Sequence, residues 1–298
     1  MRPDAFSTHH PAVTLTFFVG VIVLCVLVQQ PVLQAIGLAG AALYYICVRG
    51  RDAWRLLAGL ALAFVVLATI NPLFDTLGDT MLFTWLNGRP FTLEALAYGA
   101  STACMFVSIM LWFACYARVM SSDKFGYLFG NRAPALTLVL TMTLRLVPSY
   151  ARKARQIATA RRCAGLSMTK GSLRQRAGDG ASLLSALTTW ALEGSVTTAD
   201  SMRSRGYGTN DGAPARYAHY RFGARDAALF ALIIVCITIT CTALATGALA
   251  VAYIPAIDIP PMPPLGIAAL IAFAILVLLP SLVDAKEAIT WRFSLSRI

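Results

Sequence analysis

Long apolar runs, separated by short polar or proline-containing breaks, dominate the pattern of this chain. A helix that crosses the hydrocarbon core of a bilayer needs about 20 mostly apolar residues. Six runs approach this length, at residues 12–28, 32–48, 54–74, 95–116, 226–254 and 265–282. The pattern therefore predicts an all-α integral membrane protein with about six transmembrane helices.

Breaks between these runs carry turn-forming residues. The connections at 29–31, 75–94 and 255–264 contain proline or glycine, which end regular structure. Proline near the end of an apolar helix usually acts as a turn or kink device. We therefore expect structural roles for Asn71 and Pro72 at the end of the third run, and for Gly78 just after it.

The basic residues indicate an orientation. They gather at 49–55, at 118–132, in a block at 145–225 and in the tail after 282, whereas the other connections are poor in Lys and Arg. An excess of Lys and Arg marks the cytoplasmic loops of membrane proteins. Six spans put all basic segments on one side, so we expect a multi-pass protein of the cell (cytoplasmic) membrane with both termini in the cytoplasm.

One further apolar stretch, at 133–148, contains Arg145 and is only about sixteen residues long. A full span here would move the basic block outside the cell. We therefore predict an interfacial helix that continues as an amphipathic arm. The predicted organisation is residues 1–132 with about four spans, 133–225 as a cytoplasmic helical region, and 226–298 with two spans and a short tail.

The basic block itself predicts two helices. Between Arg145 and Arg225 it holds 14 Lys or Arg against four acids, a net charge of +10 (14 − 4) out of the formal +11. Helical spacing of apolar residues predicts helices at about 149–164 and 181–204, with a polar linker at 167–180. Gly165 and Gly206 are the expected stop signals.

Composition and the missing motifs exclude several functions. Charged residues make up 13% and mean hydropathy is +0.68, whereas soluble domains carry about a quarter charged residues. The chain lacks a P-loop, a Cys or His pattern with metal-ligand spacing, and paired carboxylates within the spans. We expect no metal site, no cofactor, no catalytic residues and no nucleic-acid partner; the basic block lies between spans, beside the lipid bilayer.

Short arginine motifs end both predicted helices: ATARRC at 158–163, and ADSMRSRG, followed by YG, at 199–206. With INPLFDTLG at 70–78 and NRAPALTLVLTMTLRLVPSY at 131–150, they resemble in order and spacing the transmembrane T component (EcfT/CbiQ type) of energy-coupling factor (ECF) transporters, a group of ABC transporters. The resemblance covers most of residues 70–221.

This resemblance implies a non-catalytic coupling subunit for ATP-driven micronutrient uptake. In that family two coupling helices dock two ABC-type ATPase subunits, which bind the ATP, and the T component holds a substrate-binding membrane S component. By position, it implies that Arg162 and Arg205 dock the ATPases in motifs that also include Arg161, Cys163, Ser204 and Gly206. Arg161 and Cys163 stand where the family has alanine and glycine, so Arg161 could share the role of Arg162 or take it.

Other interpretations of the same residues stay open. Arginines at helix C-termini also offset the helix dipole and contact anionic lipid headgroups. A conventional ABC permease, which lines its own substrate path, would carry one short coupling helix between spans. An integral membrane enzyme would need polar catalytic groups at membrane depth or a cytosolic catalytic cluster.

Overall fold

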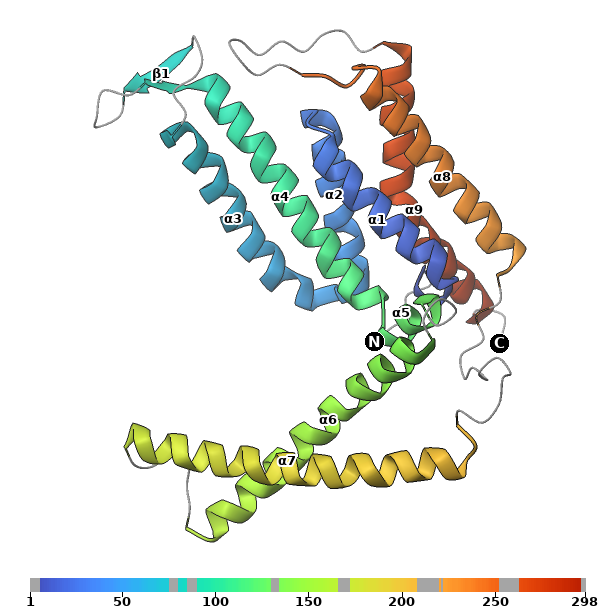
Figure 1. Cartoon of the computed structure of the whole chain (residues 1–298). Helices are drawn as coiled ribbons and strands as arrows, with labels where there is room; N and C mark the ends of the chain where they lie inside the picture. Colours follow the sequence, from blue (N-terminus) through green and yellow to red (C-terminus); the bar gives the residue numbers. More distant parts are fainter. Residues whose placement is uncertain are drawn as a thin grey trace. The chain divides into compact units, whose positions relative to one another are not determined.

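A computed structural model describes residues 6–74, 80–84, 90–129, 134–165, 172–207, 220, 222–251 and 263–295. The chain divides into two compact units (Figure 1). Unit 1 combines Met1–Ser121 with Tyr220–Ile298, and unit 2 is Ser122–His219. The division falls close to the ends of the predicted 133–225 region, with about ten more residues on its N-terminal side.

Unit 1 consists of apolar helices and one small hairpin. The elements are η1 (Phe6–Thr8), α1 (Pro11–Leu27), α2 (Pro31–Arg49), η2 (Gly50–Asp52), α3 (Ala53–Phe74), β1 (Met81–Thr84), β2 (Pro90–Thr92), α4 (Leu93–Val119), α8 (Ala224–Ala245) and α9 (Pro264–Leu295). In the described residues, five helices are long and apolar enough to cross a membrane: α2, α3, α4, α8 and the first 24 residues of α9. The sixth apolar helix, α1, has 17 residues. The predicted class, an all-α integral membrane protein, is confirmed.

The hairpin is an addition to the predicted helices. Strands β1 and β2 pair antiparallel, with Met81 opposite Thr92 and Thr84 opposite Pro90, and an irregularity between Met81 and Phe83. It lies within residues 75–94, which were predicted only as a connection that contains proline and glycine. Its Phe and Thr residues favour a pleated backbone, and Thr92 then caps α4 by accepting a hydrogen bond from the Ala95 amide.

Both late helices have ends that differ from the predicted ones. The run predicted to reach residue 254 ends as helix at Ala245, because Gly247 adopts a left-handed φ of 72° that closes the last turn. Helix α9 continues to Leu295, well past residue 282, so the predicted tail is mostly helix. Polar residues such as Lys286 are good helix formers, and loss of apolarity does not end a helix.

Aromatic side chains fill the core of unit 1 around α1. Phe17 and Phe18 of α1 meet Tyr44 of α2 and Trp112 of α4, all at most 1% exposed. Phe17 meets the Trp112 ring edge-on at 5.7 Å, and Tyr44 stacks on Trp112 at 6.3 Å. Helix α1 packs on both α4 and α8 and lies between them (Figure 1), while its other face, which includes Val19 at 51% exposure, is open.

Helix α3 lies at the edge of unit 1 and packs mainly on α4. A methyl group at Gly99 of α4 would lie 2.7 Å from the carbonyl oxygen of Ala68 and 2.9 Å from Cβ of Asn71. Pro72 is buried in the last turn of α3, which ends two residues later at Phe74. Asn71 and Pro72 thus lie at a helix contact and a helix end, and their structural role stays a prediction; Gly78 lies outside the described residues.

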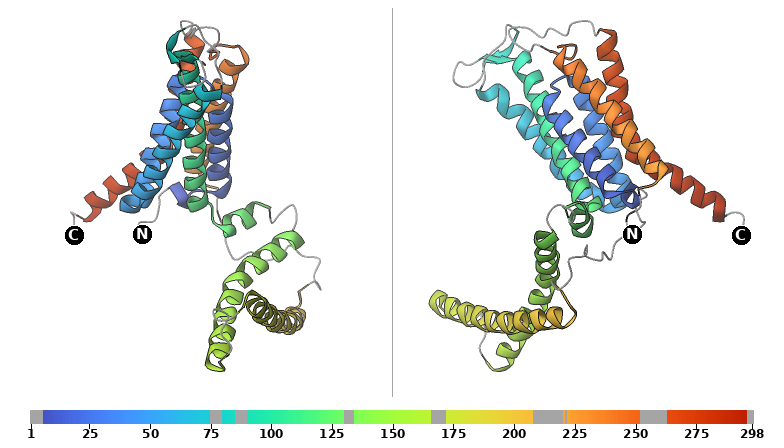
Figure 2. Two further views of the ribbon diagram at one scale, coloured as in Figure 1. Left: turned by 90° about the vertical axis from the view of Figure 1, so that its left-hand side faces the viewer. Right: turned by 45° about the vertical axis from the view of Figure 1, so that its right-hand side comes forward.

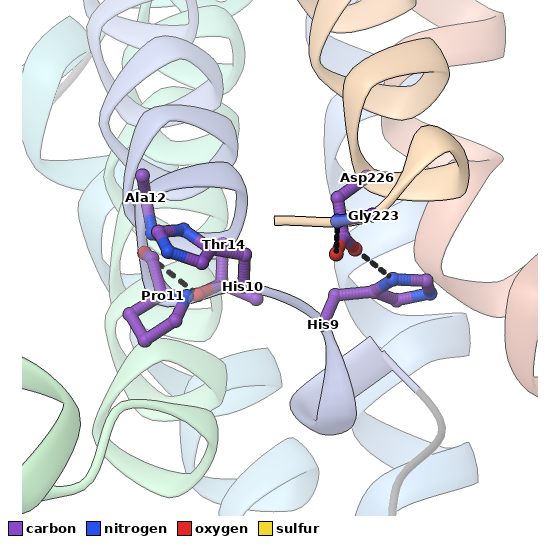
Figure 3. A network of polar contacts seen from close by, with 7 residues as sticks. All are labelled: His9, His10, Pro11, Ala12, Thr14, Gly223 and Asp226. Atoms are coloured by element: carbon purple, nitrogen blue, oxygen red, sulfur yellow. Dashed lines mark hydrogen bonds and ion pairs between the residues drawn. The ribbon is translucent and has the colours of Figure 1, made fainter. Parts of the chain in front are cut away.

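A polar network holds the N-terminal segment to α8 and α9, and Figure 3 shows its contacts with α8. Nδ1 of His9 lies 2.6 Å from Oδ1 of Asp226, in the first turn of α8. The other Asp226 oxygen accepts a hydrogen bond from the Gly223 amide at 3.2 Å. The Phe6 amide donates to Asp284 of α9, also at 3.2 Å. The contacts of His9 and Phe6 connect residues more than 200 positions apart in the sequence.

Unit 2 consists of α5 (Ser122–Phe129), α6 (Pro134–Cys163) and α7 (Leu173–Ser204). Helix α6 joins the predicted interfacial stretch and the first predicted arm into one helix that continues through Pro148. Helix α7 begins at Leu173, so the linker predicted up to residue 180 was too long by about two helical turns. The reason is the N-cap: Ser172 and Gln175 form a reciprocal capping box.

Candidate docking site on helices α6 and α7

Helix α6 changes character along its length. Its first half carries exposed apolar side chains, among them Val139 and Val147, which are 61% and 63% exposed. Its second half carries the basic residues Arg152, Lys153, Arg155, Arg161 and Arg162. An apolar half followed by a basic half suits a helix at a membrane–water interface.

The first contact between α6 and α7 is an ion pair at the end of α6. Arg161 donates hydrogen bonds to Oδ1 of Asp179 at 2.7 Å and to Oγ of Ser182 at 2.5 Å. The side chains of Arg161 and Asp179 are 16% and 22% exposed. Partial burial from solvent strengthens an ion pair relative to one on an open surface. The side chain of Arg161 therefore links α6 to α7.

An aromatic contact two to three turns away forms the second contact. The Trp190 ring of α7 meets the Tyr150 ring of α6 edge-on at 5.5 Å. Nζ of Lys153 lies 5.5 Å from the centroid of the same Trp190 ring, within cation–π range. The two contacts show which parts of the helices meet: the end of α6 contacts the early part of α7, and the middle of α6 contacts the middle of α7. The two helices cross (Figure 1).

Both helices end in the same way, with a glycine in the left-handed region. Gly165 has φ 81° and Gly206 has φ 78°. The amide of Gly165 donates to the Arg162 carbonyl at 3.1 Å, and that of Gly206 to the Arg203 carbonyl at 3.0 Å. The Tyr207 amide completes a Schellman motif on α7 by donating to the Met202 carbonyl.

This shared cap gives a structural alignment of the two motifs. Arg162 and Arg203 occupy the same position, three residues before the glycine. Arg205, the residue that precedes Gly206, aligns with Ala164. The resemblance paired Arg162 with Arg205, whereas the cap pairs Arg162 with Arg203.

The remaining motif residues are open to solvent. Arg162, Arg203 and Arg205 are exposed, and none takes part in an ion pair with another described residue. The Cys163 thiol is free and exposed, and the Ser204 hydroxyl donates to the Ser201 carbonyl one turn earlier. The guanidinium groups of these three arginines can therefore bind carboxylates of another molecule.

Helix α7 also carries an exposed apolar surface. None of its residues is fully buried. Leu183, Leu187, Trp190, Ala191 and Gly194 are half-buried, and they belong to the stripe predicted from helical spacing. Next to this stripe, Leu184, Leu192 and Val196 are 66%, 63% and 61% exposed. Exposed apolar surface of this extent is typical of a surface that contacts a membrane or another protein.

The sequence analysis did not predict which residues of α7 contact α6. Asp179 was assigned to the linker, so its ion pair with Arg161 was not foreseen. The sequence signal that identifies the true start of α7 is Ser172 followed three residues later by Gln175, a capping-box pattern. Within the described ranges, no group of three or more His, Cys, Asp or Glu residues is placed to hold a metal ion.

The fold and this site define the class of the protein: an all-α integral membrane protein with a crossed pair of long helices that end beside arginines. No model of a known protein family matches the chain, and no curated protein sequence matches it.

Proposed function

We propose that this protein is the transmembrane coupling subunit of an ECF-type, ATP-driven micronutrient uptake transporter in the cell membrane. Helices α6 and α7 are its coupling helices. They dock two cytosolic ABC-type ATPase subunits, which bind and hydrolyse the ATP. The membrane helices hold a separate substrate-binding S component, and the chain itself is non-catalytic.

The observation that carries the proposal is the matched pair of helix ends. Two long helices cross, and each ends at a left-handed glycine beside exposed arginines. A conventional permease needs only one short coupling helix, whereas this chain carries helices of 30 and 32 residues. Two separated arginine sites suit two copies of one kind of partner, each with an acidic groove.

The energies are sufficient for a stable contact. An exposed ion pair contributes only about 0–1 kcal/mol, but truncating one half of a hydrogen-bonded charge pair that becomes buried in an interface costs about 2–5 kcal/mol. Arginines that enter acidic grooves on two ATPases would therefore anchor α6 and α7. Movement of the ATPases during ATP hydrolysis would then be transmitted to the helix pair.

Co-purification tests the proposal. The tagged protein, gently solubilised from its native membrane, should bring with it two P-loop ATPase chains and a small integral membrane protein. Substitution Arg162→Ala with Arg205→Ala should reduce ATPase recovery by tenfold or more. The double variant Arg152→Ala with Arg155→Ala is the matched control, because it removes the same charge from exposed positions in the middle of α6.

The outcomes separate the candidate functions. Wild-type recovery of ATPases by the Arg162/Arg205 variant would contradict docking through these arginines. Recovery of ATPases without a second membrane protein would favour a conventional ABC permease. Recovery of the chain without any ATPase would contradict the proposal altogether.

A further inference from the structure

An apolar groove runs between α8 and α9 of unit 1, which lie side by side in Figures 1 and 2. Its volume is about 190 Å³, and its lining is Leu232 of α8 with Ile275, Leu279, Leu282, Val283 and Lys286 of α9. Leu279 forms the floor at 4% exposure, and Leu282 at the edge is 61% exposed. The lining is apolar except at one end, where Lys286 lies.

Lys286 lies at one end of this groove, and helix geometry places Arg225 toward the same end. The α9 residues from Ile275 to Lys286 share one helix face, because steps of four, seven and eleven residues return to nearly the same direction. On α8, Arg225 is seven residues before Leu232 and therefore lies on its face, two turns nearer the helix start. Since α8 runs antiparallel to α9, the start of α8 lies beside the Lys286 end of the groove.

Both cations are available to bind an anion. Arg225 and Lys286 are exposed, and neither takes part in an ion pair within the described residues. The nearby carboxylates Asp226 and Asp284 are engaged by His9 and by the Phe6 amide. Glu287 follows Lys286 but points about 100° away around the helix axis.

The length of the groove fits one leaflet of a bilayer. Eleven residues separate Ile275 from Lys286, which corresponds to about 16 Å at 1.5 Å per residue. The hydrocarbon core of a bilayer is about 30 Å thick, so one leaflet contributes about 15 Å. The groove thus matches an acyl chain in length, and its cationic end lies at the depth of the headgroup.

We propose that this groove binds one anionic phospholipid. An acyl chain lies along Leu279 between α8 and α9, and the phosphate is held by Lys286 and Arg225. The site combines a groove with two cations at one end, whereas α3 carries the single cation Arg55 near its start. The site is separate from the coupling helices, and it does not depend on the function proposed for them.

Native mass spectrometry of the full-length protein in detergent tests this site. Phosphatidylglycerol and phosphatidylcholine with identical acyl chains serve as probes. We expect one phosphatidylglycerol to be retained in preference to phosphatidylcholine. Near an anionic surface each Lys or Arg changes binding by about fivefold, so Lys286→Gln should weaken phosphatidylglycerol binding about fivefold, and the double variant with Arg225→Gln about 25-fold.

Three further variants make the test decisive. Arg55→Gln removes one exposed cation at the start of α3 and should leave the affinity within twofold of wild type. Lys286→Arg keeps the charge and should bind like wild type, whereas Ile275→Trp fills the groove and should reduce binding several-fold. Equal binding of both lipids, equal losses in Arg55→Gln and Lys286→Gln, or full retention by Ile275→Trp would each overturn the proposal.

Discussion

The ion pair between α6 and α7 makes the strongest prediction about the helix crossing. Asp179→Ala removes the carboxylate that accepts from Arg161 at 2.7 Å and leaves the guanidinium with Ser182 as its partner. An exposed pair contributes about 0.2–1 kcal/mol, and loss of one partner from a buried pair costs about 3–5 kcal/mol. With exposures of 16% and 22%, we expect an intermediate loss of about 1–2 kcal/mol.

Hydrogen exchange measures this loss directly. Weaker pairing of α7 with α6 increases the population of locally opened states. A change of 1–2 kcal/mol corresponds to a factor of about 5–30 in that population. In the full-length protein, amides near Asp179 and Trp190 should therefore exchange about 5–30 times faster in Asp179→Ala than in wild type.

The control comes from the same helix. Asp200→Ala removes an exposed carboxylate of α7 that forms no ion pair with a described residue, so it should leave exchange near residues 179–190 unchanged. Identical exchange in the two variants would refute the reasoning. A double-mutant cycle of Arg161→Ala and Asp179→Ala should give a coupling energy of about 0.5–2 kcal/mol; a coupling of zero would also count against it.

Three other substitutions test the packing of the helices. Gly99→Ala places a methyl group against the Ala68 carbonyl and should cost about 1–3 kcal/mol, seen as a lower Tm in detergent. Gly206→Ala puts a side chain at φ 78° and should cost about 1–2 kcal/mol, seen as faster exchange at the end of α7. His9→Ala removes the bond to Asp226 and should lower the Tm by the equivalent of about 1–3 kcal/mol.

Matched variants exist for each of these substitutions. A methyl group at Gly59 of α3 or Gly194 of α7 meets no atom within 4 Å. Alanine at these helix-interior positions should therefore be neutral or stabilising by up to about 1 kcal/mol. His9→Gln keeps a hydrogen-bond donor and should recover part of the loss. Equal Tm values for Gly99→Ala and Gly59→Ala would show that the close approach of α3 and α4 is not tight.

Much of the fold was predictable from the sequence because membrane helices are specified locally. Each needs a long apolar run, and the lengths and breaks of these runs predicted the membrane helices of unit 1. Helical spacing of apolar residues predicted the two long helices of unit 2. The ends of both long helices, at Gly165 and Gly206 beside arginines, were also predicted, since a glycine after a periodic run is a local signal. The least accurate boundaries were the start of α7 and the end of α8, which depend on caps, and the end of α9, which continues through polar helix-forming residues.

The tertiary structure decided which of these residues meet. Sequence alone left Arg161 and Arg162 as alternatives; the crossing of α6 with α7 engages Arg161 with Asp179 and leaves Arg162 exposed. It also decided that His9 meets Asp226, 217 positions away. Such pairs depend on the direction in which each helix packs, and that direction is set by the sum of many small side-chain contacts distributed over the whole chain.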